Sequence, residues 1–319
     1  MNLIIDNVTP ECFSRGFSHS CLDSRQKHSG MTQKFFKFTV VCLSGIALFF
    51  IGGSQCIAEH WKELGSTHFI VYYTGEEEFA RDTLDDAEVY YDRISFDLGY
   101  QRYQAFWTWE GRCNIYIYPD HQSYVRASGG QPEWSHGMAV YKTRKILSYA
   151  WHENFLDSLL PHEIAHLVFR DFVGVQAEIP VWLDEGVAQW EQQSGKDRLK
   201  SMAKELYNQN SLLTVSDMMS LDIRTVKDQD RVYVRTALTK DSGDQRILLS
   251  TNQLVNIFYI ESVSMIGFLM ERFGSQEFAA FCRELRDGKN VEEALRSTYP
   301  DLPTMKDFEN QWKAYLDEQ

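Results

Sequence analysis

The chain has 319 residues, 44% of them hydrophobic and 24% charged, and its formal net charge is −13. This composition is that of a globular protein with a buried core and excludes a disordered chain. Because nucleic-acid binders need a concentrated basic surface, and no run of Lys or Arg offsets the acidic balance, we expect no nucleic-acid partner.

The N-terminal residues have the pattern of an export signal. An uncharged apolar block at residues 38–53 is preceded by Lys34 and Lys37 and followed by a short segment that ends in Ala58. A basic segment, an apolar segment and a small-residue end are typical of a signal peptide. We therefore interpret residues 31–58 as a signal peptide and expect the protein to be exported to the periplasm, the cell envelope or the medium.

Two further interpretations concern this segment. An uncleaved signal would act as a signal-anchor, with residues 38–53 as a membrane tether, although this block is shorter than the roughly 20 residues that a spanning helix prefers. Translation from Met31 would give the signal ordinary proportions. Residues 1–30 are therefore interpreted as an extension that is not part of the native protein.

After the signal, the sequence predicts strands and helices in alternation. Residues 66–73 are rich in aromatic and β-branched side chains, which favours a strand, and residues 113–119 alternate as a strand does before a proline ends them. Residues 75–99 have apolar side chains at helical spacing and end in a glycine. A short helix capped by Asp120 follows, and residues 137–151 predict one strand or two strands joined by a polar turn.

From residue 153 onward the pattern becomes helical. One helix contains Pro161, which either begins that helix or kinks a longer one, and a second helix carries the sequence DEGVAQWEQQ. Residues 222–250 have no sustained period and are interpreted as a long loop, with a hairpin inside it as the alternative. Helices then return at residues 258–274, 275–288, 291–299 and 305–318.

These elements predict an α+β fold. Strands and helices form an N-terminal subdomain at residues 59–195, and an all-helical subdomain follows at residues 196–319. Cys113 and Cys282 are the cysteines that remain after a cleavage at Ala58, and the sequence leaves open whether they form a disulfide.

The sequence LLPHEIAHLVFR contains two histidines four residues apart. On a helix, His162 and His166 lie on one face, one turn apart, so both imidazoles can reach one ion. Zinc with three protein ligands keeps a fourth position open and lowers the pKa of a water molecule there to about 7. Glu163 is placed to accept the proton of that water. Glu185, after eighteen intervening residues, is the candidate third ligand.

The motif HEIAH, the interval of eighteen residues and the following WLDEGVA resemble the gluzincin zinc metallopeptidases, the peptidase-MA-like proteins of the aminopeptidase N and thermolysin clan. The similarity covers about residues 137–192 and is weaker towards Tyr259. The chain looks most like the compact exported members. The resemblance implies a thermolysin-like zincin fold with the active-site helix in the N-terminal subdomain.

The same resemblance implies roles for individual residues. One Zn²⁺ ion would be held by His162, His166 and Glu185, and Glu163 would be the general base. Asp184 stands where the family usually has Asn. It is either a hydrogen-bond partner of a ligand histidine or an acidic residue that favours the start of its helix.

The resemblance also places an edge strand that binds the substrate backbone at Gly137, Met138, Ala139 and Val140. A peptide can add to such an edge as a further strand. Aminopeptidases carry a glutamate in this strand that holds the free amine of the substrate, and neither these residues nor Tyr141 can replace it. Endopeptidase action is therefore favoured over aminopeptidase action.

Tyr259 is the candidate donor to the oxyanion of the tetrahedral intermediate, because the family has a tyrosine at the start of a later helix. The Lys and Gly that follow it in relatives are replaced here by Glu261 and Ser262. The alternative is a buried aromatic on a core helix.

Other histidines and tryptophans have simpler interpretations. Because the three-ligand set is complete, the two remaining histidines of this region are interpreted as surface or loop residues. The tryptophans either line a cleft or pack in the core or on the surface. The histidines are His136 and His152, and the tryptophans are Trp107, Trp109, Trp134 and Trp151.

The sequence thus predicts zinc-dependent hydrolysis of a peptide or protein substrate by an exported metallopeptidase. One alternative is a non-catalytic envelope protein that keeps zinc for stability and serves in binding or as a scaffold. Another is a membrane-tethered peptidase that acts on a single partner. Glu163 favours an enzyme over a scaffold, because a purely structural zinc site needs no general base.

Overall fold

The computed structural model describes residues 60–100, 107–129, 135–150, 154–192, 195–227, 230–237 and 244–319. Of these, Trp61–Gln319 belong to one compact unit. The predicted extension, signal peptide and membrane tether lie outside the described residues. The same holds for Trp134, Trp151, His152 and the side chain of Trp109.

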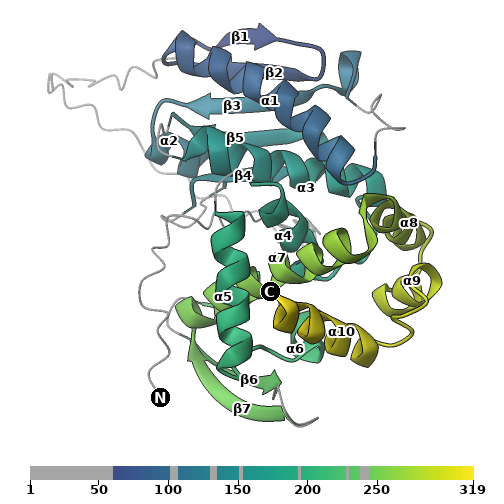
Figure 1. The fold of residues 1–319 in the computed structure, drawn as a ribbon. Coiled ribbons are helices and arrows are strands. Elements are labelled where there is room, and N and C mark those ends of the chain that lie inside the picture. Colours follow the sequence, from purple (N-terminus) through teal and green to yellow (C-terminus); the bar gives the residue numbers. More distant parts are fainter. Residues whose placement is uncertain are drawn as a thin grey trace, which may run out of the picture. The chain divides into compact units, whose positions relative to one another are not determined.

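A five-stranded mixed sheet forms the first part of this unit (Figure 1). Its order is β1-β2-β3-β5-β4, with β2, β3 and β5 parallel and β1 and β4 antiparallel at the two edges. Alternate residues of β2 and β3 are buried, as period-2 patterns predict. The strands are β1 Lys62–Gly65, β2 Phe69–Tyr73, β3 Cys113–Tyr118, β4 Gly137–Val140 and β5 Lys145–Tyr149.

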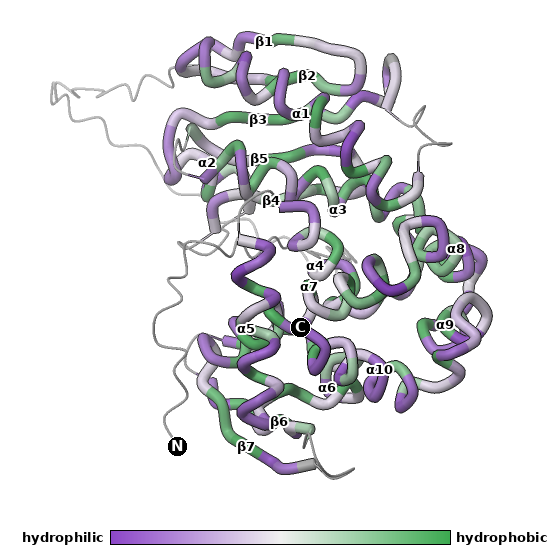
Figure 2. The backbone as a smooth tube through the Cα atoms, viewed as in Figure 1, coloured by the Kyte–Doolittle hydropathy of each residue, from purple (hydrophilic) through white to green (hydrophobic). Residues whose placement is uncertain are grey.

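Three helices accompany the sheet. Helix α1 (Glu77–Asp97) packs against β1, β2 and the metal-motif helix α3 (Leu160–Val173), which in turn packs against β4. Helix α2 (His121–Ala127) begins as predicted, because the Asp120 side chain accepts a hydrogen bond from the Ser123 amide at 2.7 Å. Figure 2 shows hydrophobic residues along β2, β3 and β5, which form the core beneath these helices.

Helix α3 follows directly on one π-helical turn, Phe155–Leu159. In this turn the Leu159 amide donates to the Asn154 carbonyl at 3.2 Å, five residues back. Pro161, the second residue of α3, has no N–H to donate to a carbonyl in the preceding turn. The helical segment thus starts before Pro161 and changes from π to α geometry next to it.

The second part of the unit is mainly helical. Helix α7 (Thr251–Phe273) is buried along most of its length and packs closely against α4 (Val181–Trp190). A Cβ atom on Gly186 of α4 would lie 2.6 Å from the Ser262 carbonyl oxygen of α7, so the close packing of these helices requires a glycine at this position. The helices are α4 Val181–Trp190, α5 Lys196–Asn208, α6 Val215–Ser220, α7 Thr251–Phe273, α8 Ser275–Arg286, α9 Val291–Thr298 and α10 Met305–Glu318.

The prediction of an all-helical C-terminal subdomain is wrong. Strands β6 (Arg231–Ala237) and β7 (Asp244–Ser250) form an antiparallel hairpin inside the segment interpreted as a loop. Val234 and Leu249 face the core, whereas Tyr233 and Leu248 are exposed. Exposed apolar and charged residues on the outer face obscure the period-2 pattern. The mixed α+β class remains correct.

Helix α7 also begins seven residues earlier than predicted, at Thr251. Ser250 caps it in a capping box with Gln253, which satisfies backbone donors at the helix start. Among the described residues, α7 alone is long and apolar enough to cross a membrane, but 83% of its apolar window is buried within the protein. It is packed as the central helix of a folded core.

The two cysteines do not pair. Cys113 lies on β3 and Cys282 on α8, and both are buried free thiols. Burial raises the pKa of the Cys282 thiol to about 12, so this thiol is protonated at neutral pH.

Candidate metal centre

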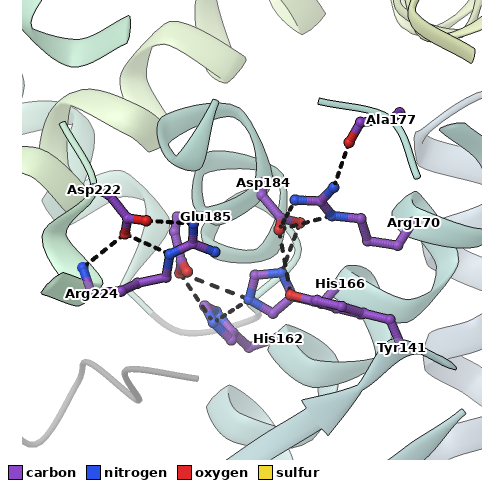
Figure 3. A network of polar contacts seen from close by, with 9 residues as sticks. All are labelled: Tyr141, His162, His166, Arg170, Ala177, Asp184, Glu185, Asp222 and Arg224. Carbon is purple, nitrogen blue, oxygen red and sulfur yellow. Dashed lines mark hydrogen bonds and ion pairs between the residues drawn. The ribbon is translucent and has the colours of Figure 1, made fainter. Parts of the chain in front are cut away.

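His162, His166 and Glu185 converge on one point (Figure 3). One ligand atom from each lies within 4.8 Å of the others. The Nε2 atoms of the two histidines are 3.1 Å apart, and Oε2 of Glu185 lies 3.7 Å from His162 Nε2 and 3.8 Å from His166 Nε2. A tetrahedral zinc ion with bonds of 2.0–2.1 Å places its ligand atoms about 3.3 Å apart. The three side chains therefore fit a metal ion.

The burial of these groups supports the same conclusion. All three side chains are at most 2% exposed, and Oε2 of Glu185 has no hydrogen-bond partner within the described residues. A buried carboxylate oxygen without a partner is costly. A cation between the two histidines and Glu185 would satisfy that oxygen.

Local folding brings the ligands together. His162 and His166 lie on α3, which is buried on nearly all sides, and Glu185 lies on α4, which packs across it. Gly174 ends α3 with φ of 93°, a backbone conformation that residues with a Cβ rarely adopt. The chain then returns through a short connection so that the first turns of α4 face the two histidines.

Asp184 orients one of the two histidines. Its Oδ1 atom lies 3.0 Å from His166 Nδ1, which leaves Nε2 of His166 facing His162 and Glu185. Burial alone would lower the pKa of His166, but the charges of Asp184 and Glu185 outweigh it and raise the pKa to about 9. Of the two interpretations of Asp184, the hydrogen-bond partner of a histidine agrees with this geometry.

The other histidine is oriented by polar groups that the sequence did not indicate. The Gln192 side-chain amide lies 3.0 Å from His162 Nδ1 and is itself bound to the Ser158 hydroxyl at 3.2 Å. The Ala188 carbonyl also interacts with the His162 ring. Gln192 thus lies at Nδ1 of His162, and Nε2 of His162 faces His166 and Glu185 as the candidate ligand atom.

Protons compete with a metal ion in this site. Burial raises the pKa of Glu185 to about 8, while the pKa of His166 lies near 9. Both shifts favour the protonated forms, so protons compete with a cation for these ligand atoms. Metal affinity should consequently increase with pH.

Glu163 lies on α3 beside the ligands and is completely buried. Burial raises its pKa to about 7, whereas His166 and the Ala139 amide of β4 act in the opposite direction. Neither of its carboxylate oxygens makes a well-formed hydrogen bond within the described part of the chain. A carboxylate with a pKa near neutrality can exchange protons with a reacting group at physiological pH.

The predicted substrate strand is the edge strand β4. Among the described residues, the strand pairs with β5 alone, at the end of the five-stranded sheet; it comprises Gly137, Met138, Ala139 and Val140. The interaction of the Ala139 amide with Glu163 places this edge next to the candidate general base.

Tyr259 is completely buried on α7. It lies one helical turn before Ser262, whose carbonyl oxygen lies against Gly186, next to Glu185. Helix α7 therefore passes beside the third ligand. The role of Tyr259 at the oxyanion stays a prediction.

Arg170, Tyr141 and Arg224 are also part of the site, although the sequence did not indicate them (Figure 3). Arg170 binds Asp184 through two nitrogens, and the Tyr141 hydroxyl donates to the same carboxylate at 3.4 Å. Burial raises the pKa of Glu185, and the positive charge of Arg224, held by Asp222, partly opposes this rise. Sequence spacing alone could have indicated Arg170, which follows His166 by four residues and shares its helix face.

The remaining sequence candidates lie elsewhere. His136 binds the Tyr149 hydroxyl through Nδ1 at 2.6 Å and is not one of the grouped ligands. Trp107 is completely buried in the core and donates to Asp171 at 2.6 Å. Trp107 is thus a packing residue and does not line an exposed cleft.

Glu261 is completely buried on α7. Its Oε1 atom accepts a hydrogen bond from the Leu213 amide at 2.8 Å. Burial raises the pKa of Glu261 well above its ordinary value, and the nearby Glu309 acts in the same direction. Since the folded state holds the proton more tightly, this carboxyl stabilises the fold below pH about 4.5 and loses that contribution as pH rises through its folded pKa.

Replacing Glu261 with Gln should therefore stabilise the protein at neutral and alkaline pH. The Gln oxygen can still accept the Leu213 bond, and the side chain cannot ionise. We expect a gain on the order of 1 kcal/mol in the free energy of unfolding at pH 8 and little gain near pH 4.5. Urea denaturation at both pH values measures it, with exposed Glu292→Gln as control. Equal gains at both pH values would contradict a buried carboxyl that ionises at a cost.

Comparison with known proteins adds no assignment. No protein-family model matches the chain, and a search of curated proteins finds no significant match. The function must therefore be argued from the motif and from the geometry of the site.

Proposed function

We propose that this protein is an exported zinc metallopeptidase of the gluzincin type with a thermolysin-like zincin fold. The observation that carries the proposal is the buried group of His162, His166 and Glu185, with Glu163 beside it on the same helix. The ligand spacing suits zinc, and the mixed imidazole and carboxylate set is typical of catalytic rather than structural zinc sites.

A zinc ion held by these three residues would supply a Lewis acid for the scissile carbonyl and would lower the pKa of a water molecule to about 7. Glu163 accepts a proton from the attacking water as its oxygen bonds to the carbonyl carbon. It then delivers that proton to the amine nitrogen as the C–N bond breaks. The pKa of Glu163, near 7, suits both steps. Tyr259 is proposed to donate a hydrogen bond to the oxyanion.

The proposed substrate is a peptide or protein segment in extended conformation. It would bind along the outer edge of β4 by strand addition, with backbone hydrogen bonds to Gly137–Val140. None of these residues can bind a free α-amine as a carboxylate does. Cleavage within a chain is therefore favoured over removal of an N-terminal residue.

A peptide-library assay tests this proposal. The purified protein should cleave internal bonds of a mixed library of unstructured peptides, and a chelator should abolish cleavage until zinc is restored. Mass spectrometry of the products locates the cleaved bonds. Zinc binding with no cleavage would favour the non-catalytic scaffold, and cleavage that survives complete removal of metal would overturn the proposal.

A further inference from the structure

The carboxylate of Asp184 is held on all sides. Its Oδ1 accepts from His166 Nδ1 at 3.0 Å. Its Oδ2 accepts from Arg170 Nη2 at 2.7 Å, from Arg170 Nε at 3.0 Å and from the Tyr141 hydroxyl at 3.4 Å. Since Asp184 is 3% exposed, these contacts fix the rotamer of the carboxylate.

Arg170 joins three parts of the chain. It follows His166 by one turn of α3, binds Asp184 on α4 and donates from Nη1 to the Ala177 carbonyl at 3.3 Å, in the connection between the two helices. Its guanidinium also brings one positive charge to a buried region that contains the carboxylates of Glu163, Asp184 and Glu185. A buried ion pair offsets the cost of its desolvation only where its hydrogen bonds are well formed.

Tyr141 connects the same group to the substrate edge. It directly follows β4, its ring lies edge-on to His166 with centroids 6.2 Å apart, and Arg170 lies 5.5 Å from the centre of its ring. The Tyr141 hydroxyl thus binds Asp184, and the Tyr141 ring lies beside His166 and Arg170.

We infer that Arg170 and Tyr141 are positioning residues that fix the metal ligand His166 by holding Asp184. Arg170 supplies two directed bonds and a compensating charge, and Tyr141 supplies a third bond and packing from the end of β4. With the carboxylate fixed, the His166 ring keeps Nδ1 as donor and Nε2 as ligand atom. The inference rests on the proposed zinc site.

Metal affinity of the full chain tests this inference without any assay of hydrolysis. Hydrogen-bond partners of ligand histidines typically change metal affinity by roughly 10-fold to 100-fold. Arg170→Met should raise the zinc dissociation constant by that amount. Arg170→Lys keeps the charge without the paired bonds and should raise the zinc dissociation constant by about 2-fold to 5-fold. Tyr141→Phe removes only the longest hydrogen bond to Asp184 and should raise the zinc dissociation constant by about 2-fold to 5-fold.

Arg144→Met is the matched control. Arg144 forms an ion pair with Asp171 of α3, Nε to Oδ2 at 2.7 Å, and within the described residues Asp171 is not one of the grouped ligands. The control should lower thermal stability and leave the zinc dissociation constant unchanged. Cobalt substituted for zinc gives a second readout, because its visible absorption reports ligand geometry and should change in Arg170→Met and not in Arg144→Met.

The outcomes are separable. Unchanged zinc affinity and cobalt spectrum in Arg170→Met, with only a lower Tm, would show a purely structural role and overturn the inference. If Arg170→Met does not fold, Arg170→Lys and Tyr141→Phe decide, and wild-type values in both would overturn it. A wild-type chain that binds neither zinc nor cobalt would refute the proposed function itself, whereas wild-type zinc binding with insensitive variants refutes only the positioning role.

Discussion

Replacing Glu163 with Gln should reduce peptide hydrolysis by about 10³-fold while one zinc ion per chain stays bound. Gln has the shape of Glu and no basic oxygen, and general-base catalysis typically contributes 10²-fold to 10⁴-fold. The three ligand atoms do not involve Glu163, so metal binding should persist. Because Glu163 is completely buried and makes no well-formed hydrogen bond within the described residues, the uncharged amide should also be tolerated by the fold.

The measurement combines the rate of peptide cleavage at saturating substrate with the zinc content of the same sample. Glu178→Gln makes the identical change at an exposed position between α3 and α4 and should keep the wild-type rate. Hydrolysis at the wild-type rate in Glu163→Gln would refute the role of Glu163 as base. Loss of zinc in this variant would instead assign Glu163 to the ligand set.

Replacing His166 with Ala should remove both metal and hydrolysis. The variant loses one of three ligand atoms and leaves Asp184 without its imidazole partner, while Arg170 still binds that carboxylate. We expect the zinc dissociation constant to increase by at least about 10³-fold, since each ligand contributes a large share of the binding free energy. Elemental analysis after dialysis and competition with a chromogenic chelator measure the loss.

His136→Ala is the control for His166→Ala. His136 flanks β4 and binds Tyr149, outside the grouped ligands, so one zinc ion should remain. An unchanged zinc content in His166→Ala would place the ion elsewhere. Together with Glu163→Gln, these variants separate two functions of one helix, because one variant keeps the metal without turnover and the other loses both.

The pair of histidines could be predicted because its geometry is local. A spacing of four residues on a helix places His162 and His166 on one face, one turn apart, so this spacing alone determines that their side chains are neighbours. Glu185 lies on a second helix, and its role followed only from a family resemblance. The structure brings Glu185 within 3.8 Å of both histidines.

The groups that orient the ligands could not be predicted in the same way. Gln192 and Tyr141 reach the histidines from the end of α4 and from the end of β4, and no periodic pattern relates these positions to α3. Such contacts depend on how helices and strands pack, which hydrophobic spacing determines only in outline. Arg170 is an intermediate case. Helical spacing predicts that it shares the α3 face of His166, whereas its contact with Asp184 depends on how α4 packs.

The helices and strands show the same difference between what a local side-chain pattern predicts and what depends on packing or pairing. Strong alternation identified β2 and β3, and helical spacing identified α1 and α8. Strand β1 has mainly exposed residues and is stabilised by backbone pairing with β2, so no side-chain pattern indicates it. The hairpin β6–β7 was predicted only as the alternative to a long loop for a related reason, since its outer face mixes arginines with an exposed Tyr233.

The π-helical turn at Phe155–Leu159 has a consequence for how this chain tolerates insertion and deletion. A π turn holds one residue more than an α turn, so side chains upstream of it are rotated by about 100° relative to a continuous α-helix. Ser158 reaches Gln192, and through it His162, with this extra residue in place. Loss of a single residue here would rotate Ser158 away from Gln192, and the ring of Pro161 would clash with a carbonyl of the preceding α turn. The metal site therefore depends on the length of a segment that contains no ligand.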